Sequence, residues 1–251
     1  MITRVKTKSE IIAMRQSGQR LGHVLNHLRN TVEVGMSTKE VADIARDELA
    51  RVGGKPAFLG MYGFPDVLCI SLNDEVVHGI PQANKIIEDG DIVSMDFGVK
   101  LDGMITDAAI SVVVGTTEKT SRRKLVAITE EALLAGIETL RDGVRVGTIS
   151  NAIEKVLNKH HYGIVRDLVG HGVGHELHEE PNIPNYGKSD TGMILKAGMT
   201  IAIEPMATLG GYAVVTDSDG WTIRTQDSSD SAHFEHTILI TQDGYEILTK
   251  I

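Results

Sequence analysis

The sequence predicts an α/β fold, arranged as two pseudo-symmetric halves packed into one unit. The chain has 251 residues, which is long for one simple domain and short for two independent ones. No proline-rich or low-complexity linker divides it. Three pairs of residues also recur at an offset of 108 residues: Gly35 and Gly143, Gly90 and Gly198, and Asp96 and Glu204. We therefore expect a single domain over residues 1–251, with repeats at approximately 10–115 and 121–240.

Each repeat is expected to contain a helix, a turn, a second helix, and later a glycine, an apolar strand and an acid. In the first repeat, Ser37 and Glu40 have the spacing of a helix capping box before an apolar periodic segment. In the second, apolar periodicity predicts a helix over residues 121–141, which Gly143 ends. A further apolar stripe predicts a helix over residues 148–160. We interpret these stripes as core-facing.

Residues 91–114 predict a β-hairpin, because two β-rich runs flank the turn dipeptide Asp102-Gly103. If those two residues form the loop, Asp96 lies opposite Ala109, and Asp107 lies opposite Gly98. Asp96 and Asp107 then become diagonal neighbours on one face, roughly 7–8 Å apart at their α-carbons. Carboxylates at that spacing can converge on an ion. A three-residue loop would instead place them on opposite faces.

Two further acids, Glu204 and Glu235, occur within apolar, β-rich runs. A single acid in a strand is usually solvent-facing, but four acids in strand contexts are less easily explained in this way. Two converging carboxylates about 4 Å apart repel by roughly 4 kcal/mol at an effective dielectric near 20. Divalent cations relieve this repulsion and supply Lewis acidity. Carboxylates together with an imidazole suit two ions such as Mn, Fe(II), Co or Zn. The acids therefore suggest a dinuclear hydrolytic site with a metal-bridging hydroxide as nucleophile.

The stretch GHGVGHELHEEP, residues 170–181, contains three candidate imidazole ligands. His171, His175 and His178 would share one face of a helix. However, three glycines alternate with the first residues of this run, and each costs about 1 kcal/mol in a helix relative to alanine. We therefore expect a glycine-rich turn or an extended loop that directs side chains into a cleft. The spacing alone does not select the ligand among the three histidines.

Composition restricts the cellular setting. The net charge of −9 gives no general reason to expect DNA or membrane binding. The single cysteine, Cys69, excludes an internal disulfide framework and fits a reducing compartment. The N-terminal residues lack the apolar segment of a signal peptide, and no apolar run approaches the length of a membrane span. We expect a cytoplasmic protein.

Together, the motifs resemble those of the type I methionine aminopeptidases, a family of metallopeptidases with the pita-bread fold. The matching blocks occur in family order over essentially the whole chain: VVHGIP, DIVSMDFGV, ITDAA, GHGVGHELHEEP, TIAIEPM, DGWTIRTQD and FEHTI. The resemblance implies two pseudo-symmetric halves with an antiparallel β-sheet core covered by helices. It also implies the compact bacterial form of the family.

The resemblance further implies a role for each matched residue. Five residues would bind two divalent ions, with the second and the last bridging them: Asp96, Asp107, His171, Glu204 and Glu235. His178 would hydrogen-bond the scissile amide, and His78 would lie near the substrate backbone and leaving group. Glu204 would also handle the proton of the nucleophilic water. His175 matches no catalytic role in the family, so we interpret it as a surface or loop-stabilising residue.

The expected substrate pocket departs from the family pattern. Cys69, Phe64 and Trp221 match or nearly match family positions. Phe58, Met61 and Leu177 replace residues that are often cysteine, tyrosine and phenylalanine in relatives, and ordinary core packing also explains Phe58 and Met61. A pocket rich in Met, Phe and Leu stays apolar and can accept an unbranched thioether. These departures concern the stringency of methionine selection more than the type of reaction.

The resemblance predicts methionyl aminopeptidase activity, with excision of N-terminal methionine from peptides and nascent chains. Family precedent predicts a monomer that meets nascent chains at the ribosome. Three alternatives remain. A proline-specific or creatinase-like peptidase usually carries an additional N-terminal domain, which we expect this chain to lack. A non-catalytic module could bind peptide N-termini, although such relatives tend to lose metal ligands. A general dinuclear hydrolase acting on another small amide is excluded only through the resemblance.

Overall fold

The computed structural model describes residues 3–116, 118 and 120–250. Its helices are α1 (Lys8–Thr31), α2 (Thr38–Val52), the 3-10 turn η1 (Met61–Gly63), α3 (Thr120–Ile137) and α4 (Val146–Lys159). The strands of the first half are β1 (Lys55–Pro56), β2 (Leu68–Leu72), β3 (Glu75–Val77), β4 (Ile92–Leu101) and β5 (Met104–Val113). Those of the second half are β6 (Gly163–Ile164), β7 (Gly170–Gly172), β8 (Glu179–Ile183), β9 (Thr200–Ile203), β10 (Met206–Thr208), β11 (Val214–Thr216), β12 (Ile223–Thr225), β13 (Ser231–His233), β14 (His236–Ile240) and β15 (Tyr245–Ile247).

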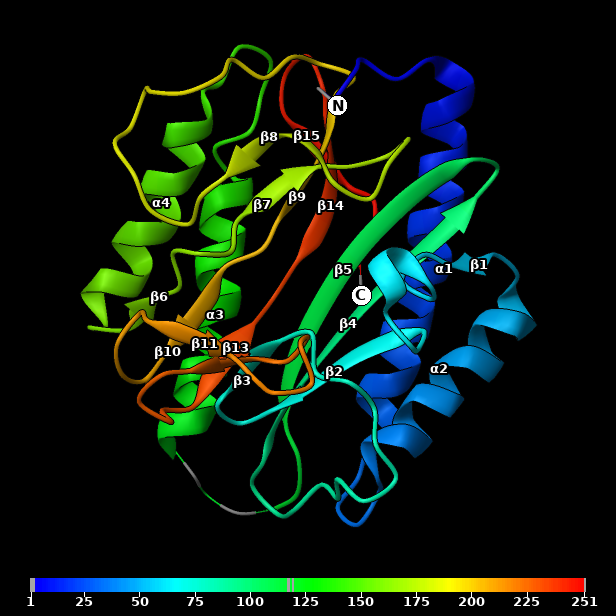
Figure 1. Ribbon diagram of the computed structural model, residues 1–251. Coiled ribbons are helices and arrows are strands. Elements are labelled where there is room, and N and C mark those ends of the chain that lie inside the picture. The colour runs from blue at the N-terminus through cyan, green and yellow to red at the C-terminus, as the bar shows by residue number, and fades with distance from the viewer. Residues whose placement is uncertain (1–2, 117, 119, 251) are drawn as a thin grey trace.

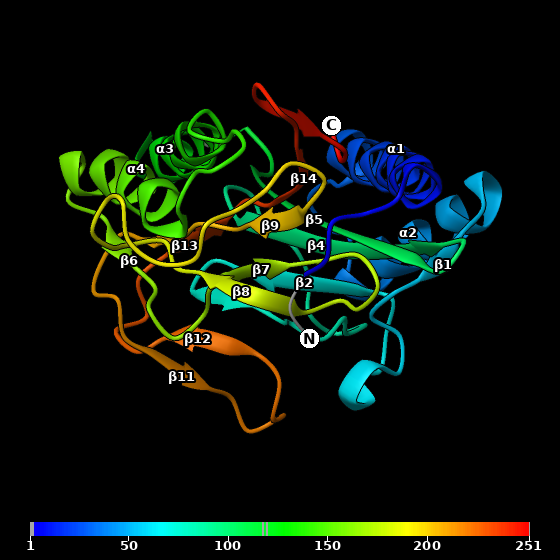
Figure 2. The same ribbon diagram turned by 90° about the horizontal axis from the view of Figure 1, so that it is seen from above.

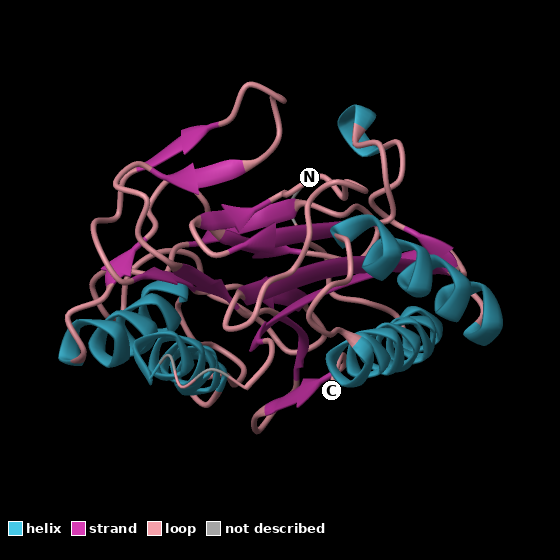
Figure 3. Ribbon diagram, turned by 90° about the horizontal axis from the view of Figure 1, so that it is seen from below, coloured by secondary structure: helices cyan, strands magenta, loops and turns pink. Residues whose placement is uncertain are grey.

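The strands form a central antiparallel layer that carries both helix pairs on one side (Figures 1 and 2). The pair α1–α2 covers the half that contains β4 and β5, and the pair α3–α4 covers the other half. The β11–β12 hairpin and the η1 turn lie on the opposite side of the strand layer, as the labels and colours of Figure 2 show and the view from below in Figure 3 repeats. This mixed α/β arrangement confirms the predicted fold class. No helix in the described part of the chain is both long and apolar enough to cross a bilayer.

Equivalent backbone features in the two halves are separated by the offset of 108 residues. Isolated antiparallel bridges join Ser37 to Ile86 and Arg145 to Ile194. Gly90 and Gly198 both adopt positive φ, of 86° and 88°. Such a φ is strained for residues with a side chain, and these two glycines therefore allow the same turn before β4 and before β9.

The predicted β4–β5 hairpin is confirmed, including its register. Asp96 pairs with Ala109 and Gly98 pairs with Asp107, as a two-residue loop requires. Asp102 and Gly103 have φ values of 48° and 84°. Positive φ at both central residues is the geometry whose twist matches that of the flanking strands, and Asp-Gly favours it. The local turn chemistry thus sets the face on which both aspartates lie.

The helix predictions are confirmed in existence and differ at the ends. Ser37 and Glu40 make both hydrogen bonds of the capping box that starts α2. The helix expected over residues 121–141 ends at Ile137, because the amides of Thr139 and Leu140 donate to carbonyls three residues back. Such bonds tighten a last turn into 3-10 geometry. The helix expected over residues 148–160 is α4, which begins two residues earlier than predicted.

Candidate active site

The strand register gathers three of the predicted acids around Ala109. This residue pairs with Asp96 of β4, and on its other edge it forms an antiparallel bridge with Glu235. Directly paired residues share a face of a sheet, and so do residues two apart on one strand. Asp96, Asp107 and Glu235 therefore point to the same side. Ala109 itself is 1% exposed, and its small side chain leaves room for the three carboxyl groups.

A second alanine organises the other half of the site in the same way. Ala202 of β9 pairs with His171 of β7 and with Thr237 of β14. Glu204 lies two residues after Ala202, and Glu235 lies two residues before Thr237. By the alternation rule, His171, Glu204 and Glu235 face one side. Glu235 belongs to both sets and so joins the two halves of the site.

The expectation that Glu204 and Glu235 lie within strands is wrong in detail. Glu204 follows the end of β9, and Glu235 lies between β13 and β14. Pro205 directly follows Glu204 and has no N–H to donate, so the ladder cannot continue past this point. Glu235 keeps extended pairing through its bridge to Ala109, with N···O distances of 2.9 and 3.2 Å. Both acids thus project from strand ends into the cleft.

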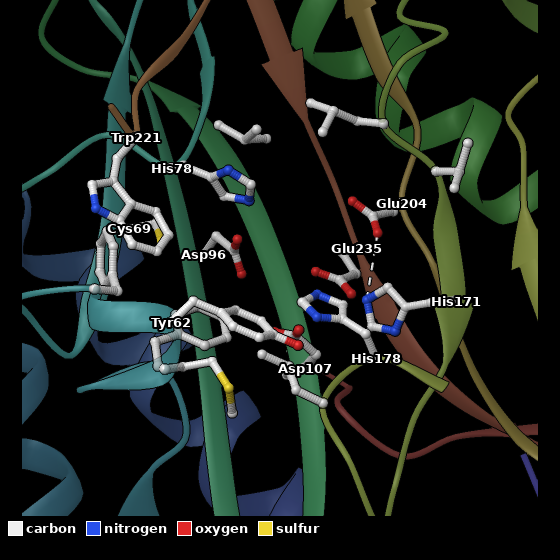
Figure 4. Close-up of a pocket in the computed structure, with 17 residues that line it drawn as sticks. Tyr62, Cys69, His78, Asp96, Asp107, His171, His178, Glu204, Trp221 and Glu235 are labelled. Carbon is white, nitrogen blue, oxygen red and sulfur yellow. Dashed lines mark ion pairs between the residues drawn. The ribbon is translucent and has the colours of Figure 1, made fainter. Parts of the chain in front are cut away.

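The predicted site residues all line one cavity of ≈180 Å³. Its wall includes every residue to which the resemblance assigned a role or a pocket position: Phe58, Met61, Phe64, Cys69, His78, Asp96, Asp107, His171, Leu177, His178, Glu204, Trp221 and Glu235. An apolar cavity of roughly 150 Å³ accommodates benzene, so this volume is of the order of one side chain. Trp221 and Cys69 lie on one side, and His171, Glu204 and Glu235 lie on the other (Figure 4). The cavity therefore has an apolar end and an acidic end.

The acidic end fits a divalent metal. Asp107, His171 and Glu235 offer ligand atoms that all lie within 4.8 Å of one another. One carboxyl oxygen of each of Asp96, Asp107 and Glu235 is buried without a hydrogen-bond partner in the described part of the chain. Buried unpaired oxygens are costly, and buried charges are normally paired or bound to metals. The donor set of carboxylates and one imidazole suits first-row divalent ions.

Burial also raises the pKa values of these acids. The pKa rises from 3.8 to about 7 for Asp96 and from 4.5 to about 8 for Glu204. For Asp107 and Glu235, burial and then the neighbouring carboxylates raise the pKa well above its ordinary value. In the absence of a cation, the site therefore favours protonated acids. A divalent ion stabilises the charged forms and binds in competition with those protons.

His171 presents one defined nitrogen to the cavity. Its Nδ1 is 3.0 Å from the carbonyl oxygen of Gly172, and because a carbonyl oxygen only accepts, Nδ1 carries the proton. The unprotonated Nε2 lies 3.5 Å from Oε1 of Glu204. Burial lowers the pKa of His171 to about 4, which keeps the imidazole neutral near pH 7. A neutral imidazole fixed by a backbone carbonyl is the usual form of a histidine ligand.

The other two predicted histidines border the acidic cluster without joining its closest group. His178 packs edge-on against His171, with ring centroids 4.6 Å apart. His78 follows β3 with a φ of 60°, an uncommon value that turns its side chain into the cavity (Figure 4). Burial lowers the pKa of His78 to about 4 and also lowers that of His178. Both side chains are therefore neutral N–H donors near pH 7.

The apolar end of the cavity contains pocket residues that match the family pattern and pocket residues that depart from it. Phe58, Phe64, Cys69 and Leu177 are each at most 6% exposed. The rings of Phe64 and Trp221 meet edge-on, with centroids 5.2 Å apart. Burial raises the pKa of the Cys69 thiol well above its ordinary value, so it contributes as a small apolar group. Together with Met61, these side chains form the expected hydrophobic pocket.

Four further residues of the wall are not apparent from the motifs: Tyr62, Val77, Leu168 and Val169. Tyr62 stands in the η1 turn at a φ of 50°, 78% exposed, and its ring is nearly parallel to that of His178 at 6.4 Å. The aromatic residue between Gly60 and Gly63 was a signal for a turn at the pocket mouth. The apolar residues carry no distinguishing chemistry, so sequence alone could not select them.

The stretch GHGVGHELHEEP forms β7, a tight turn and the start of β8, which confirms the predicted glycine-rich turn. His175 does not line the cavity. Its Nε2 lies 2.8 Å from Oε1 of Glu10 in α1, and its amide donates to Glu179 Oε1 at 2.7 Å. The second carboxyl oxygen of Glu179 accepts from Lys6 Nζ at 3.1 Å. His175 and the Lys6–Glu179 pair therefore tie the turn that carries His178 to the N-terminal segment.

The Lys6–Glu179 ion pair is buried, with side-chain exposures of 0% and 1%. We expect Glu179→Gln to lower the free energy of unfolding by about 3–5 kcal/mol, because it leaves the Lys6 ammonium buried without its counter-charge. Urea unfolding at neutral pH measures this change. The matched control is Arg15→Gln, which breaks the Arg15–Glu246 pair whose side chains are 45% and 38% exposed. That substitution should cost at most about 1 kcal/mol. Equal costs for the two variants would contradict the prediction.

Comparison with known proteins agrees with this geometry. The sequence model of metallopeptidase family M24 matches residues 12–242. Over 247 residues the chain is 44% identical to the methionine aminopeptidase of Clostridium perfringens, with 98% of each chain covered. The crystal structure of methionine aminopeptidase from Thermotoga maritima matches with a TM-score of 0.97 and 43% identity, over 100% of both chains. These matches confirm the resemblance to bacterial methionine aminopeptidases.

The rival expectation of a proline-specific peptidase has weaker support. Prolidase from Pyrococcus furiosus matches with a TM-score of 0.78 and 26% identity. That match covers 98% of this chain and 65% of the prolidase. The shared pita-bread fold is evident in both comparisons, while identity and coverage are higher for the aminopeptidases. The chain belongs to metallopeptidase family M24.

Proposed function

We propose that the protein is a metal-dependent aminopeptidase that removes methionine from the N-termini of peptides and nascent proteins. One observation carries the proposal: a cluster of buried acids and one imidazole, with unpaired carboxyl oxygens, lies at one end of a cavity whose other end is apolar. A cavity sized for about one side chain suits an enzyme that takes a single terminal residue. The names of the relatives from Clostridium perfringens and Thermotoga maritima agree with this substrate.

Family membership and the acidic cluster indicate the use of a divalent metal. We propose that two ions bind, held by Asp96, Asp107, His171, Glu204 and Glu235, and that they are drawn from Mn, Fe(II), Co and Zn. When bound, such ions polarise a carbonyl and lower the pKa of water, which is the chemistry that amide hydrolysis requires.

The remaining polar residues of the cavity supply hydrogen bonds and handle protons. His178 and His78 are neutral N–H donors on opposite borders of the acidic cluster, where they can stabilise the developing oxyanion and orient the substrate backbone (Figure 4). A carboxyl oxygen of Glu204 would accept the proton of the attacking water and pass it to the leaving amine.

Selection of the terminal residue falls to the apolar end of the cavity. Phe58, Met61 and Leu177 line this end, where relatives often have cysteine, tyrosine and phenylalanine. All three side chains are apolar, and that of Met61 is flexible. Such a pocket can adapt its shape to an unbranched thioether. One methylene in a hydrophobic pocket is worth only about 1–3 kcal/mol. We therefore expect methionine to be preferred over leucine by a modest factor.

We further propose that residues 1–251 act as one catalytic domain with an internal repeat, at approximately 10–115 and 121–240. The bridges and glycines that recur at the 108-residue offset support this division. The acidic cluster takes residues from both halves, so neither half would be active alone. A cytoplasmic monomer that acts on nascent chains at the ribosome is the setting that we propose.

The proposal is tested by measuring release of free methionine from Met-Gly-Met-Met, beside Leu-Gly-Met-Met and Met-Pro-Gly. The protein is first stripped with a chelator and then reconstituted separately with Mn²⁺, Fe²⁺, Co²⁺ or Zn²⁺. We expect no release without metal, restored release with at least one ion, and about 10–200-fold faster release of methionine than of leucine. Equal release of leucine would contradict methionine selectivity but not aminopeptidase activity. Bound metal without any release would instead support a module that only binds peptide N-termini.

A further inference from the structure

His233 is a buried histidine whose ring lacks a hydrogen-bond partner. The residue is 1% exposed and ends strand β13, two residues before Glu235. Neither Nδ1 nor Nε2 has a hydrogen-bond partner in the described part of the chain. A neutral imidazole carries one N–H, and a buried donor left without an acceptor costs about 1–3 kcal/mol. We therefore expect this ring to donate a hydrogen bond to a polar group that it faces.

The strand register directs this ring toward Glu204. His233 pairs with Met206 of β10, and Glu204 lies two residues before Met206. This register places the end of β13 beside the segment that carries Glu204. Nε2 of His233 is 3.6 Å from Oε2 of Glu204, slightly beyond hydrogen-bond length. Among the described residues, no other carboxylate oxygen forms an ion-pair contact with this ring within 4.0 Å.

The backbone around His233 is held firmly in place. Its amide donates to Ser111 Oγ at 2.9 Å, and that hydroxyl donates to the His233 carbonyl oxygen at 2.8 Å. Ser111 Oγ is also 2.7 Å from Oγ of Ser94 in β4. These contacts attach β13 to the β4–β5 hairpin. The ring can therefore act as a fixed support for a neighbouring side chain.

His171 cannot give Glu204 the same support. The carboxyl group of Glu204 lies between two imidazoles, with Oε1 3.5 Å from His171 and Oε2 3.6 Å from His233. Nδ1 of His171 donates to the Gly172 carbonyl, so its Nε2 bears a lone pair and has no proton for Oε1. Of the two histidines beside Glu204, His233 is therefore the one that can donate a hydrogen bond to its carboxyl group. Oε1 of Glu204 is then left to face the cavity.

We infer that His233 is a positioning residue that donates a hydrogen bond from Nε2 to Oε2 of Glu204, so that Oε1 is held toward the metal site. This inference rests on the proposed function, because it treats Glu204 as a metal ligand. His233 does not line the cavity, so it acts through Glu204 rather than on the substrate. Hydrogen bonds from such outer residues fix the orientation of a ligand, and their loss typically lowers metal affinity by about 10–100-fold.

The test compares His233→Leu, which removes the donor, with His233→Gln, whose amide can still donate. Calorimetric titration of the chelator-stripped full chain with Mn²⁺ measures affinity independently of catalysis. We expect His233→Leu to lose about 10–100-fold in Mn²⁺ affinity, and His233→Gln to recover most of this loss. With methionyl peptide, His233→Leu should lower kcat while KM stays near the wild-type value, because the apolar end of the cavity is untouched.

A matched control is His236→Leu. This histidine directly follows Glu235, and successive side chains of a strand point to opposite faces. The ring of His236 faces Thr249, with Nδ1 3.1 Å from Oγ1, so its loss should leave Mn²⁺ affinity unchanged within about threefold. Mn²⁺ affinity of His233→Leu equal to that of wild type would overturn the inference. Equal loss in His233→Leu and His233→Gln would also overturn it, since shape alone would then matter. A wild-type protein that binds no Mn²⁺ would contradict both this inference and the proposed function.

Discussion

Replacing Asp107 with asparagine is expected to abolish metal-dependent cleavage while leaving the metal-free protein at least as stable as wild type. Asp107 belongs to the closest group of ligand atoms, with His171 and Glu235. Changes to outer residues already cost about 10–100-fold in metal affinity, so loss of this carboxylate should cost more than about 100-fold. In the metal-free protein, burial raises the pKa of Asp107 well above its ordinary value, so folding at neutral pH has to protonate this carboxyl group, and the neutral amide of asparagine avoids that cost.

The stability of the metal-free wild-type protein should carry a pH signature of the same cluster. The pKa of Asp96 rises from 3.8 to about 7 on folding, and that of Glu204 from 4.5 to about 8. Between these values the folded protein binds more protons than the unfolded chain, so the free energy of unfolding falls as pH rises from about 4 to about 8. One pKa unit corresponds to about 1.4 kcal/mol, so the rise in the pKa of these coupled acids makes the decline large enough to measure. Metal should weaken this dependence.

Thermal unfolding with and without Mn²⁺, recorded from pH 4 to pH 8, tests these expectations beside the peptide assay. The control is Asp102→Asn, in the turn of the same hairpin, where the side chain is exposed and asparagine also tolerates positive φ. This variant should keep wild-type activity and the wild-type response to metal. If metal raised the melting temperature of Asp107→Asn as much as that of wild type, Asp107 would not be a ligand.

Replacing His178 with alanine is expected to lower kcat by about 100–1,000-fold, the usual effect of removing one oxyanion donor. The ring of His178 lines the cavity and packs against His171, yet it is not part of the closest ligand group. Metal affinity should therefore stay within about threefold of wild type, well short of the 10–100-fold loss seen when a ligand loses its support. Steady-state kinetics on methionyl peptide and calorimetric titration with Mn²⁺ separate the two effects.

His175→Gln is the matched control, because His175 occupies the same turn three residues earlier. Its ring contacts Glu10 of α1 and does not line the cavity. Glutamine can still donate to that carboxylate, so kcat should remain close to wild type. A comparable loss of kcat in both variants would show that distortion of the turn, rather than loss of the His178 donor, explains the effect.

The β4–β5 hairpin shows how far local sequence can predict the site. The dipeptide Asp102-Gly103 specifies a two-residue loop, and loop length fixes register, so the sequence alone places Asp96 and Asp107 on one face. The glycine-rich turn around His175 is predictable for a similar reason, since glycine disfavours a helix there. The end of α3 is not, because bonds to carbonyls three residues back replace the regular pattern beyond Ile137.

By itself, the sequence determined the features that depend on neighbouring residues and on motif order: the α/β class, the hairpin register, the capping box at Ser37 and the set of candidate ligands. Tertiary structure decided how strands from distant segments pair. It placed Glu235 beside Ala109, and His171 and Thr237 on either edge of Ala202. It also brought His233 to Glu204 and Glu10 to His175. Such contacts join residues far apart in the chain, and they arise from the packing of the whole fold, so no local pattern could specify them.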